Sequence, residues 1–176
     1  QKRVDQTIRR FGGEGDNWHM SWAADDKVYA SLCDGHGFPG MPQANYNSRM
    51  YVIAGDPPDL RFEFISTYPD LVNSGPRSFS RYYNFGTLAL GGRLYQFLST
   101  PNVPFNEPSP RFVGAKLIYS PDGGKTWCNQ DGSSPVRWEP WEDRSKQNMA
   151  FFKEDGDAFS LITVLQMGKD YQYNTD

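Results

Sequence analysis

The side chains with the clearest chemical potential fall in two short stretches near the start of the chain, residues 16–19 and 33–37. Their reactive or sugar-stacking members are Asp16, Asn17, Trp18, His19, Asp34 and His36. Two neighbouring carboxylates can divide the acid and the base or nucleophile duties of hydrolysis at a glycosidic bond. A tryptophan beside them offers a flat apolar face on which a sugar ring can stack. The chemistry requires a fold that brings the two stretches together.

A hairpin that turns at Asp25-Asp26 would do so. With a two-residue turn, antiparallel pairing places Asn17 opposite Asp34 and Asp16 opposite Gly35. With a three-residue turn, Asp16 faces Asp34 directly. Both registers predict that the two carboxylates lie at the open end of the hairpin. A structural explanation stays open as well, because Asn and Asp also cap loops. We predict no metal or other cofactor, since these acids and histidines lack the spacing of a metal site.

The chain repeats itself, which predicts how this hairpin is supported. Residues 23–34 align without a gap with residues 89–100, 66 positions later, and residues 148–159 form a more diverged third copy. In that copy Phe159 stands where Tyr95 stands. We expect inner hairpins near 17–34, 84–100 and 148–165, with turns at 25–26, 91–92 and 155–156. Each expected inner strand begins near an asparagine: Asn17, Asn84 and Asn148.

A second hairpin follows in each of the first two repeats, near 49–65 and 115–130. Two hairpins per period make a four-stranded antiparallel unit, as in a propeller blade, and the chain would hold about 2.7 such units. Because a closed propeller needs roughly four or more blades, we predict an all-β, partial β-propeller over residues 1–176, completed by further chain or further copies. A β-sandwich is the alternative fold.

Residues 120–127 read S-x-D-x-G-x-x-W, a pattern that resembles the Asp-box, or BNR repeat, of sialidase-like β-propellers. We expect Asp122 to accept hydrogen bonds from backbone N–H groups in a tight turn, for which the following glycines supply positive φ angles. Trp127 should cover that turn. Strand alternation puts the turn at the same end as the inner turns and opposite Asp34, so Asp122 is expected to stabilise the turn and not to catalyse.

The composition excludes several classes of function. The net charge is −3 with both signs interspersed, and the absence of a basic stripe argues against a nucleic-acid partner. No apolar run approaches about 18 residues, which argues against a membrane span. The two cysteines, Cys33 and Cys128, form no disulfide framework, and we expect unpaired thiols.

The segment 15–29, followed by residues 34–38, resembles a family of bacterial propellers long catalogued as a domain of unknown function. Its pattern is roughly G-D-N/T-W-P-x-x-W-x-D-D-x-x-Y, then G-D-G-x-G-F, and Gly55–Asp59 resembles it too. Some members are endo-D-arabinanases, and the architecture is a five-bladed propeller. The resemblance covers nearly the whole chain and implies the N-terminal three-fifths of such a domain. His19 replaces a frequent Pro and Cys33 a common Gly, which puts the substrate in doubt.

The resemblance implies a glycoside hydrolase that acts on a polysaccharide, with an arabinan-like substrate and an extracellular or periplasmic location. The alternative is a non-catalytic module that binds carbohydrate or protein. The expected catalytic residues are Asp16 and Asp34. The expected substrate-binding residues are Asn17, Trp18, His19, His36, Tyr83 and Asn84. One of the two acids should have a raised pKa, so that it can donate a proton near neutral pH.

Overall fold

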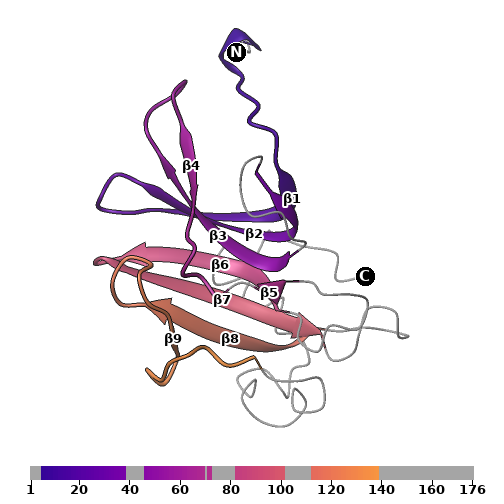
Figure 1. Ribbon diagram of the computed structural model, residues 1–176, viewed down its shortest axis with the longest axis vertical. Helices are drawn as coiled ribbons and strands as arrows, with labels where there is room; N and C mark the ends of the chain where they lie inside the picture. Colours follow the sequence, from indigo (N-terminus) through magenta and orange to yellow (C-terminus); the bar gives the residue numbers. More distant parts are fainter. Residues whose placement is uncertain (1–4, 39–45, 70, 73–81, 102–111, 139–176) are drawn as a thin grey trace, which may run out of the picture.

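The computed structural model describes residues 5–38, 46–69, 71–72, 82–101 and 112–138. These residues form two antiparallel β-sheets, one packed on the other (Figure 1). A short 3-10 helix, Asp5–Thr7, precedes the first sheet, and this part of the chain contains no α-helix. The all-β prediction is therefore confirmed for the described residues.

Each sheet is a meander of four strands in which neighbours in sequence are hydrogen-bonded, and the first sheet has one additional short strand. The first sheet contains β1 (Glu14–Trp22), β2 (Val28–Gly37), β3 (Tyr46–Ala54), β4 (Arg61–Phe64) and the short β5 (Leu71–Val72), which pairs with β3. The second contains β6 (Tyr83–Leu90), β7 (Arg93–Pro101), β8 (Phe112–Ser120) and β9 (Cys128–Asn129). The same four-stranded arrangement thus recurs one sequence period later.

The strand pairs lie where the turn chemistry places them. Leu90 pairs with Arg93, and Gly91 and Gly92 between them have φ angles of 59° and 76°, as a two-residue type I′ turn requires. The connection from β1 to β2 is longer, since Trp22 pairs with Val28. The hairpin expected at 148–165 lies outside the described residues. The two sheets do not close on themselves, so the propeller remains a prediction.

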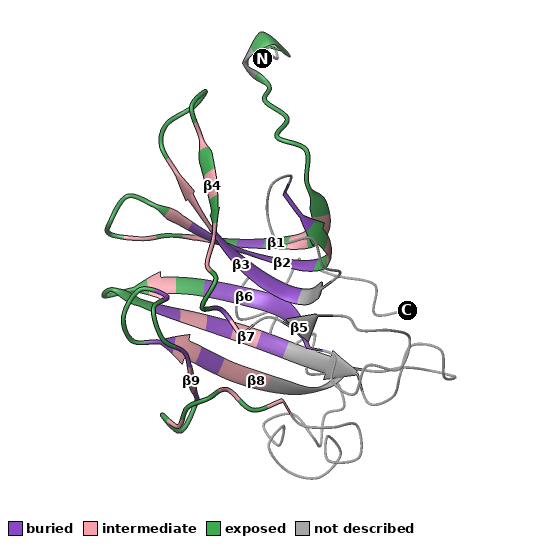
Figure 2. Ribbon diagram, in the orientation of Figure 1, coloured by how far each residue is buried: buried purple, intermediate pink, exposed green. Residues whose placement is uncertain are grey.

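The core lies between the two sheets, where β6 contacts β1, β2 and β3 (Figure 2). Burial of this apolar surface is the main force that holds the sheets together. Side-chain hydrogen bonds also cross the interface. The hydroxyl oxygens of Ser31 and Thr87 lie 2.8 Å apart, and the Ala89 N–H donates to Ser21 Oγ at 2.9 Å. The buried core residues are Tyr29, Met50, Tyr68, Tyr82, Leu94, Leu98, Ile118 and Trp127.

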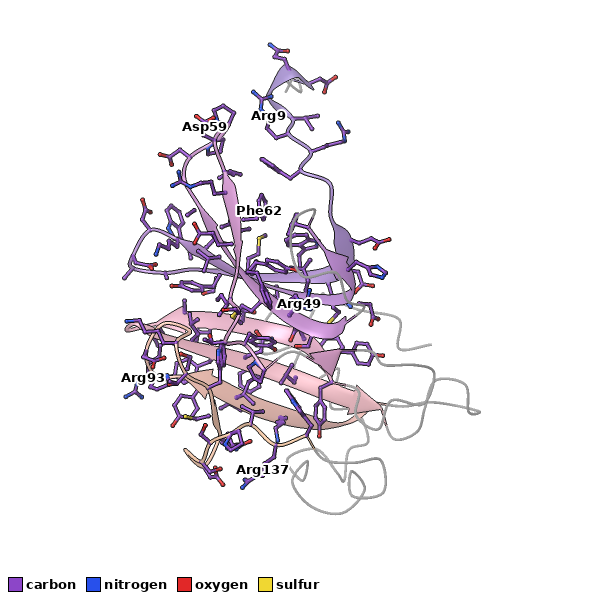
Figure 3. All side chains as sticks on the ribbon, viewed as in Figure 1. Arg9, Arg49, Asp59, Phe62, Arg93 and Arg137 are labelled. Carbon is purple, nitrogen blue, oxygen red and sulfur yellow. The ribbon has the colours of Figure 1, made fainter. Side chains whose placement is uncertain are left out.

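A second cluster covers the other face of the first sheet. Leu32 and Tyr51 are buried there, and the ring of Phe62 lies 5.0 Å from that of Phe11 in the N-terminal segment. Arg49, labelled in Figure 3, is also buried, and its guanidinium carbon lies 4.8 Å from the ring centre of Phe64. The N-terminal segment and β4 therefore shield this face.

The turn at 120–127 is built around Asp122. Its Oδ1 accepts the N–H groups of Lys125 at 3.0 Å and of Thr126 at 2.8 Å, and its Oδ2 accepts the Thr126 hydroxyl at 2.8 Å. Ser120 Oγ donates to Asp122 Oδ1 and accepts the Gly124 N–H. These bonds, above all that from the Thr126 N–H, lower the pKa of Asp122.

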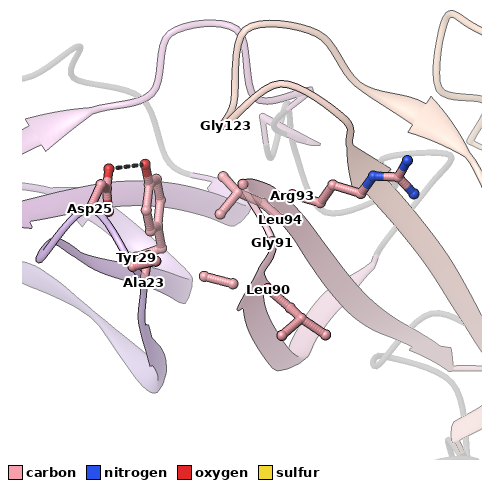
Figure 4. A pocket seen from close by; sticks show the side chains of 11 residues that line it. Ala23, Asp25, Tyr29, Leu90, Gly91, Arg93, Leu94 and Gly123 are labelled. Carbon is pink, nitrogen blue, oxygen red and sulfur yellow. Dashed lines mark hydrogen bonds between the residues drawn. The ribbon is translucent and has the colours of Figure 1, made fainter.

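The Asp122 turn lies at the same end of the sheets as the two inner turns. A Cβ on Gly123 would lie 3.9 Å from the Gly92 carbonyl oxygen. These turns surround a small pocket of about 120 Å³, at which Asp25 accepts the Tyr29 hydroxyl at 3.1 Å (Figure 4). Asp34 lies at the opposite end of β2. The prediction that Asp122 and Asp34 occupy opposite ends of the sheets is confirmed.

Asp122→Ala is expected to lower the midpoint of thermal unfolding at pH 7 by on the order of 5 °C, because it leaves two backbone N–H groups of the turn without their acceptor. A carboxylate with a lowered pKa stabilises the fold above its ordinary pKa of 3.8 and loses this effect as the pH falls through the folded value. The difference in unfolding midpoint between Asp122→Ala and the wild type should therefore become smaller below pH 4. Lys125→Ala, a change in the same turn that keeps the N–H, is the control. An equal loss in both variants would contradict the role of the carboxylate.

Candidate functional site

The candidate site lies at the end of the first sheet where β1 begins and β2 ends. We call residues 14–18 and 34–38 the rim. Near the turn the pairing is regular, from Trp22 opposite Val28 to His19 opposite Ser31, but it then shifts, so that Asp16 lies opposite Cys33. Both predicted partners of Asp16, Gly35 and Asp34, were therefore wrong. The cause is a bulge, which changes the register between His19 and Asp16.

The bulge places two of the predicted site residues in left-handed backbone conformations. Asn17 has a φ of 48° and Asp34 a φ of 37°. Asn and Asp adopt this region more readily than other non-glycine residues, and such outliers gather at functional sites. Gly35 follows with a φ of 140°, and a Cβ there would lie 2.4 Å from the backbone oxygen of Glu14. The two strands thus approach at the rim more closely than any side chain at position 35 permits.

Most of the rim side chains face solvent. Asp16, Asp34 and His36 are exposed, and Asn17 is half-buried. Trp18 is 40 % exposed, and its ring meets that of Phe38 edge-on at 5.6 Å. The contact holds the indole in place while part of its surface stays open. The rim therefore brings together five of the eight predicted site residues, Asp16, Asn17, Trp18, Asp34 and His36.

The two carboxylates lie around one buried thiol. Burial raises the pKa of Cys33 well above its usual range, a backbone hydrogen bond with Asn84 lowers it, and the charges of Asp34 and Asp16 raise it further. Asp16 pairs with Cys33 across the hairpin and Asp34 follows Cys33 in the chain, so both acids lie next to this thiol. Partial loss of water contact also raises the pKa of Asp16, although its side chain is exposed. Asp16 therefore keeps its proton to a higher pH than an ordinary aspartate does.

Glu14 is a rim residue that the sequence reasoning missed. Its Oε2 lies 2.5 Å from Nδ1 of His36, so the pair links the start of β1 to the end of β2. Both side chains are exposed. The sequence carried no signal for this pair, because only the shifted register places Glu14 opposite Gly37, the residue after His36.

Three predicted binding residues do not lie on the rim. His19 and Tyr83 are only 5 % and 6 % exposed, and Asn84 is completely buried. The His19 ring lies 6.2 Å from that of Phe85 on β6. The head of β6 is covered by the first sheet and does not open beside the rim. These residues belong to the core between the sheets, which corrects their assignment as sugar contacts.

Asn84 joins the two sheets through both the nitrogen and the oxygen of its side-chain amide. Its Nδ2 donates to the Leu32 carbonyl at 2.8 Å, and its Oδ1 accepts the Ser48 hydroxyl at 2.7 Å and the Tyr68 hydroxyl at 3.2 Å. Its backbone N–H contacts Cys33 Sγ at 2.9 Å. The asparagine that recurs in the repeat is therefore, at this position, a structural link between neighbouring units.

Three further observations apply to the described residues. Within the described ranges, no group of three His, Cys, Asp or Glu side chains is placed to share a metal ion. Cys33 and Cys128 are free thiols. No helix in this part of the chain is both long and apolar enough to span a membrane.

No protein-family model matches the chain, and no curated protein sequence matches it. The likeness of residues 15–29 and 34–38 to the arabinanase-containing propeller family therefore rests on those motifs alone.

Proposed function

We propose that the rim is the glycan site of a carbohydrate-active protein, and that the protein is a glycoside hydrolase. The observation that carries the proposal is the position of Asp16 opposite Cys33 and of Asp34 next to Cys33 in the chain, at the end of the sheet that also holds the partly exposed ring of Trp18. A sugar bound at this end of the sheet would have a stacking surface in the indole of Trp18 and hydrogen-bond acceptors in the two carboxylates.

The two acids would have different roles. The raised pKa of Asp16 suits a general acid, which must hold a proton until the leaving group takes it. Asp34 would then act as the nucleophile or as the base that activates water. A separation of roughly 5 Å between the carboxyl groups would favour retention of configuration, and roughly 6.5–9.5 Å would favour inversion.

The motif resemblance adds the substrate class and the location to this proposal. It favours a polysaccharide of the arabinan type and an extracellular or periplasmic protein. The interspersed charges of the chain argue against a nucleic acid as the partner.

A non-catalytic binding module is the second candidate, and one observation favours it. Asp16, Trp18 and Asp34 are all exposed, whereas most hydrolytic sites exclude water around the acid. In a module, the same carboxylates would accept hydrogen bonds from sugar hydroxyls, and Trp18 would supply the stacking surface.

The test is Asp34→Asn and Asp16→Asn, assayed for cleavage of arabinan and a panel of other glycans. Each change should lower the rate at least about 100-fold, because an amide neither donates a proton nor acts as a nucleophile. Asp59→Asn, an exposed change in the β3–β4 turn (Figure 3), should leave the rate unchanged. Unchanged cleavage in both rim variants would remove these acids from the mechanism. Binding without cleavage in the wild type would favour the module.

A further inference from the structure

The exposed face of β1 continues from the rim toward the turn of the first hairpin. Burial alternates along this strand, and Trp18, Met20 and Trp22 are 40 %, 57 % and 73 % exposed. Ser21 accepts a hydrogen bond from the second sheet, so its neighbours Met20 and Trp22 point away from that sheet. The Trp18 ring contacts Phe38, which belongs to the cluster on the same side. We call Trp18, Met20 and Trp22 the β1 stripe.

Beside Met20, the uncovered surface is only one strand wide. Met20 pairs with Ala30, and Ala30 pairs with Tyr51 on the next strand, so the three share one face of the sheet. Ala30 and Tyr51 are nevertheless completely buried, and the rings of Phe38 and Phe64 lie against Tyr51. Among the described strands, β1 pairs only with β2 and forms the edge of the sheet. A packed sheet needs a broader face, whereas a single extended chain fits on a strip of this width.

A polar contact holds the indole of Trp22 in place. Its Nε1 donates to Asp26 Oδ1 at 3.0 Å, within the turn of the hairpin. The bond restrains the ring although most of the side chain remains exposed. A fixed aromatic ring loses little conformational freedom when a ligand stacks on it, which favours binding. Trp22 is therefore a second stacking surface of the kind that Trp18 supplies at the rim.

The dimensions and charges of the stripe indicate the kind of ligand. Trp18 and Trp22 are four residues apart on one strand, which is about 13 Å and more than one sugar ring extends. Asp16 lies on the exposed face before Trp18, and Asp26 lies beside Trp22. These carboxylates repel anionic polymers and accept hydrogen bonds from hydroxyl groups. The stripe thus fits an uncharged chain of several sugar units.

We propose that the β1 stripe is a second subsite, at which a linear, uncharged polysaccharide bound at the rim continues along β1 and stacks on Trp22. The inference rests on the proposed glycan site at the rim, and it adds that the ligand is a chain long enough to reach both tryptophans. Trp18 binds the sugar unit next to the acids, Trp22 binds a unit farther along the chain, and Met20 supplies an apolar contact between them.

The test measures how affinity depends on the length of the glycan. Arabinan, xylan and a β-glucan, each as a disaccharide and as a long oligosaccharide, are titrated by calorimetry into Asp34→Asn, in which the proposed cleavage does not consume the probe. The long form of the probe that binds best should bind more tightly than its disaccharide. Adding Trp22→Ala should reduce this gain at least about 5-fold, whereas Trp22→Phe keeps a flat ring and should retain most of it. Leu90→Ala, at an exposed apolar residue of the second sheet, should leave the gain unchanged.

The other outcomes separate this inference from the proposed function. Binding that is lost in Trp18→Ala but unaffected by Trp22→Ala would keep the glycan site at the rim and overturn the subsite. The absence of binding by any probe would overturn both, and equal affinity for short and long forms would overturn the subsite.

If Trp22→Ala lowers the melting midpoint of its parent, Asp26→Ala decides, because it only releases the indole. The long chain should then bind more weakly, and unchanged binding would overturn the subsite. Self-association in sedimentation that Trp22→Ala abolishes would assign the stripe to a second copy of the chain and would also overturn it.

Discussion

Asn84→Ala is expected to lower the free energy of unfolding by about 3 kcal/mol, because it leaves buried groups without their partners. The Leu32 carbonyl would lose its side-chain donor, and the Ser48 and Tyr68 hydroxyls would lose a shared acceptor. The site is completely buried, so water cannot replace these bonds without opening the interface between the sheets.

Urea unfolding measures this effect through the midpoint and the slope of the transition. Ser31→Ala is the control, since it acts at the same interface but removes mainly the Ser31–Thr87 contact, and it should cost about 1 kcal/mol. A loss in Asn84→Ala no larger than in Ser31→Ala would show that the amide does not link the sheets.

The contrast between the predicted and the observed role of Asn84 shows what the repeat could predict. Turn chemistry located the hairpins, because Gly91-Gly92 between apolar runs has few alternatives. The repeat therefore placed Asn84 correctly at the head of an inner strand. It did not indicate which surface of the next unit would lie over that strand, since packing between sheets depends on residues far apart in sequence. The amide that was expected to meet a sugar is enclosed by the first sheet instead.

The sequence predicted most of the residues that form the rim, but it did not predict how the two strands pair there. The bulge arises at Asn17 and Asp34, residue types that adopt a left-handed backbone more readily than other non-glycine residues but that also occur in regular strands and loops, so their presence alone did not locate it. Gly35 did carry a signal, but its reason, the close approach of the Glu14 backbone, appears only in three dimensions. The Glu14–His36 pair was missed for the same cause, because the shifted register brings these two side chains together.

Asp16→Asn is expected to change cleavage and stability in opposite directions, a result that a merely structural role for Asp16 would not produce. If Asp16 is the general acid, cleavage should fall by about 10²–10⁴-fold in the variant. In the wild type the rate should decline on the alkaline side as Asp16 loses its proton, at a pH above the ordinary range of aspartate because its pKa is raised. The variant should lack this limb of the profile.

The expected effect of Asp16→Asn on stability is opposite in sign to its effect on cleavage. A carboxyl whose folded pKa lies above its unfolded value of about 3.8 destabilises the fold once the pH rises through that folded value. Asp16→Asn removes this loss, so the variant should melt no lower than the wild type at pH 7, and the difference should shrink as the pH falls and Asp16 takes up its proton. Rates of cleavage from pH 4 to pH 9, with melting curves over the same range, measure both. A variant that loses activity and stability together would assign Asp16 to the architecture of the bulge, and the acid would have to be sought elsewhere on the rim.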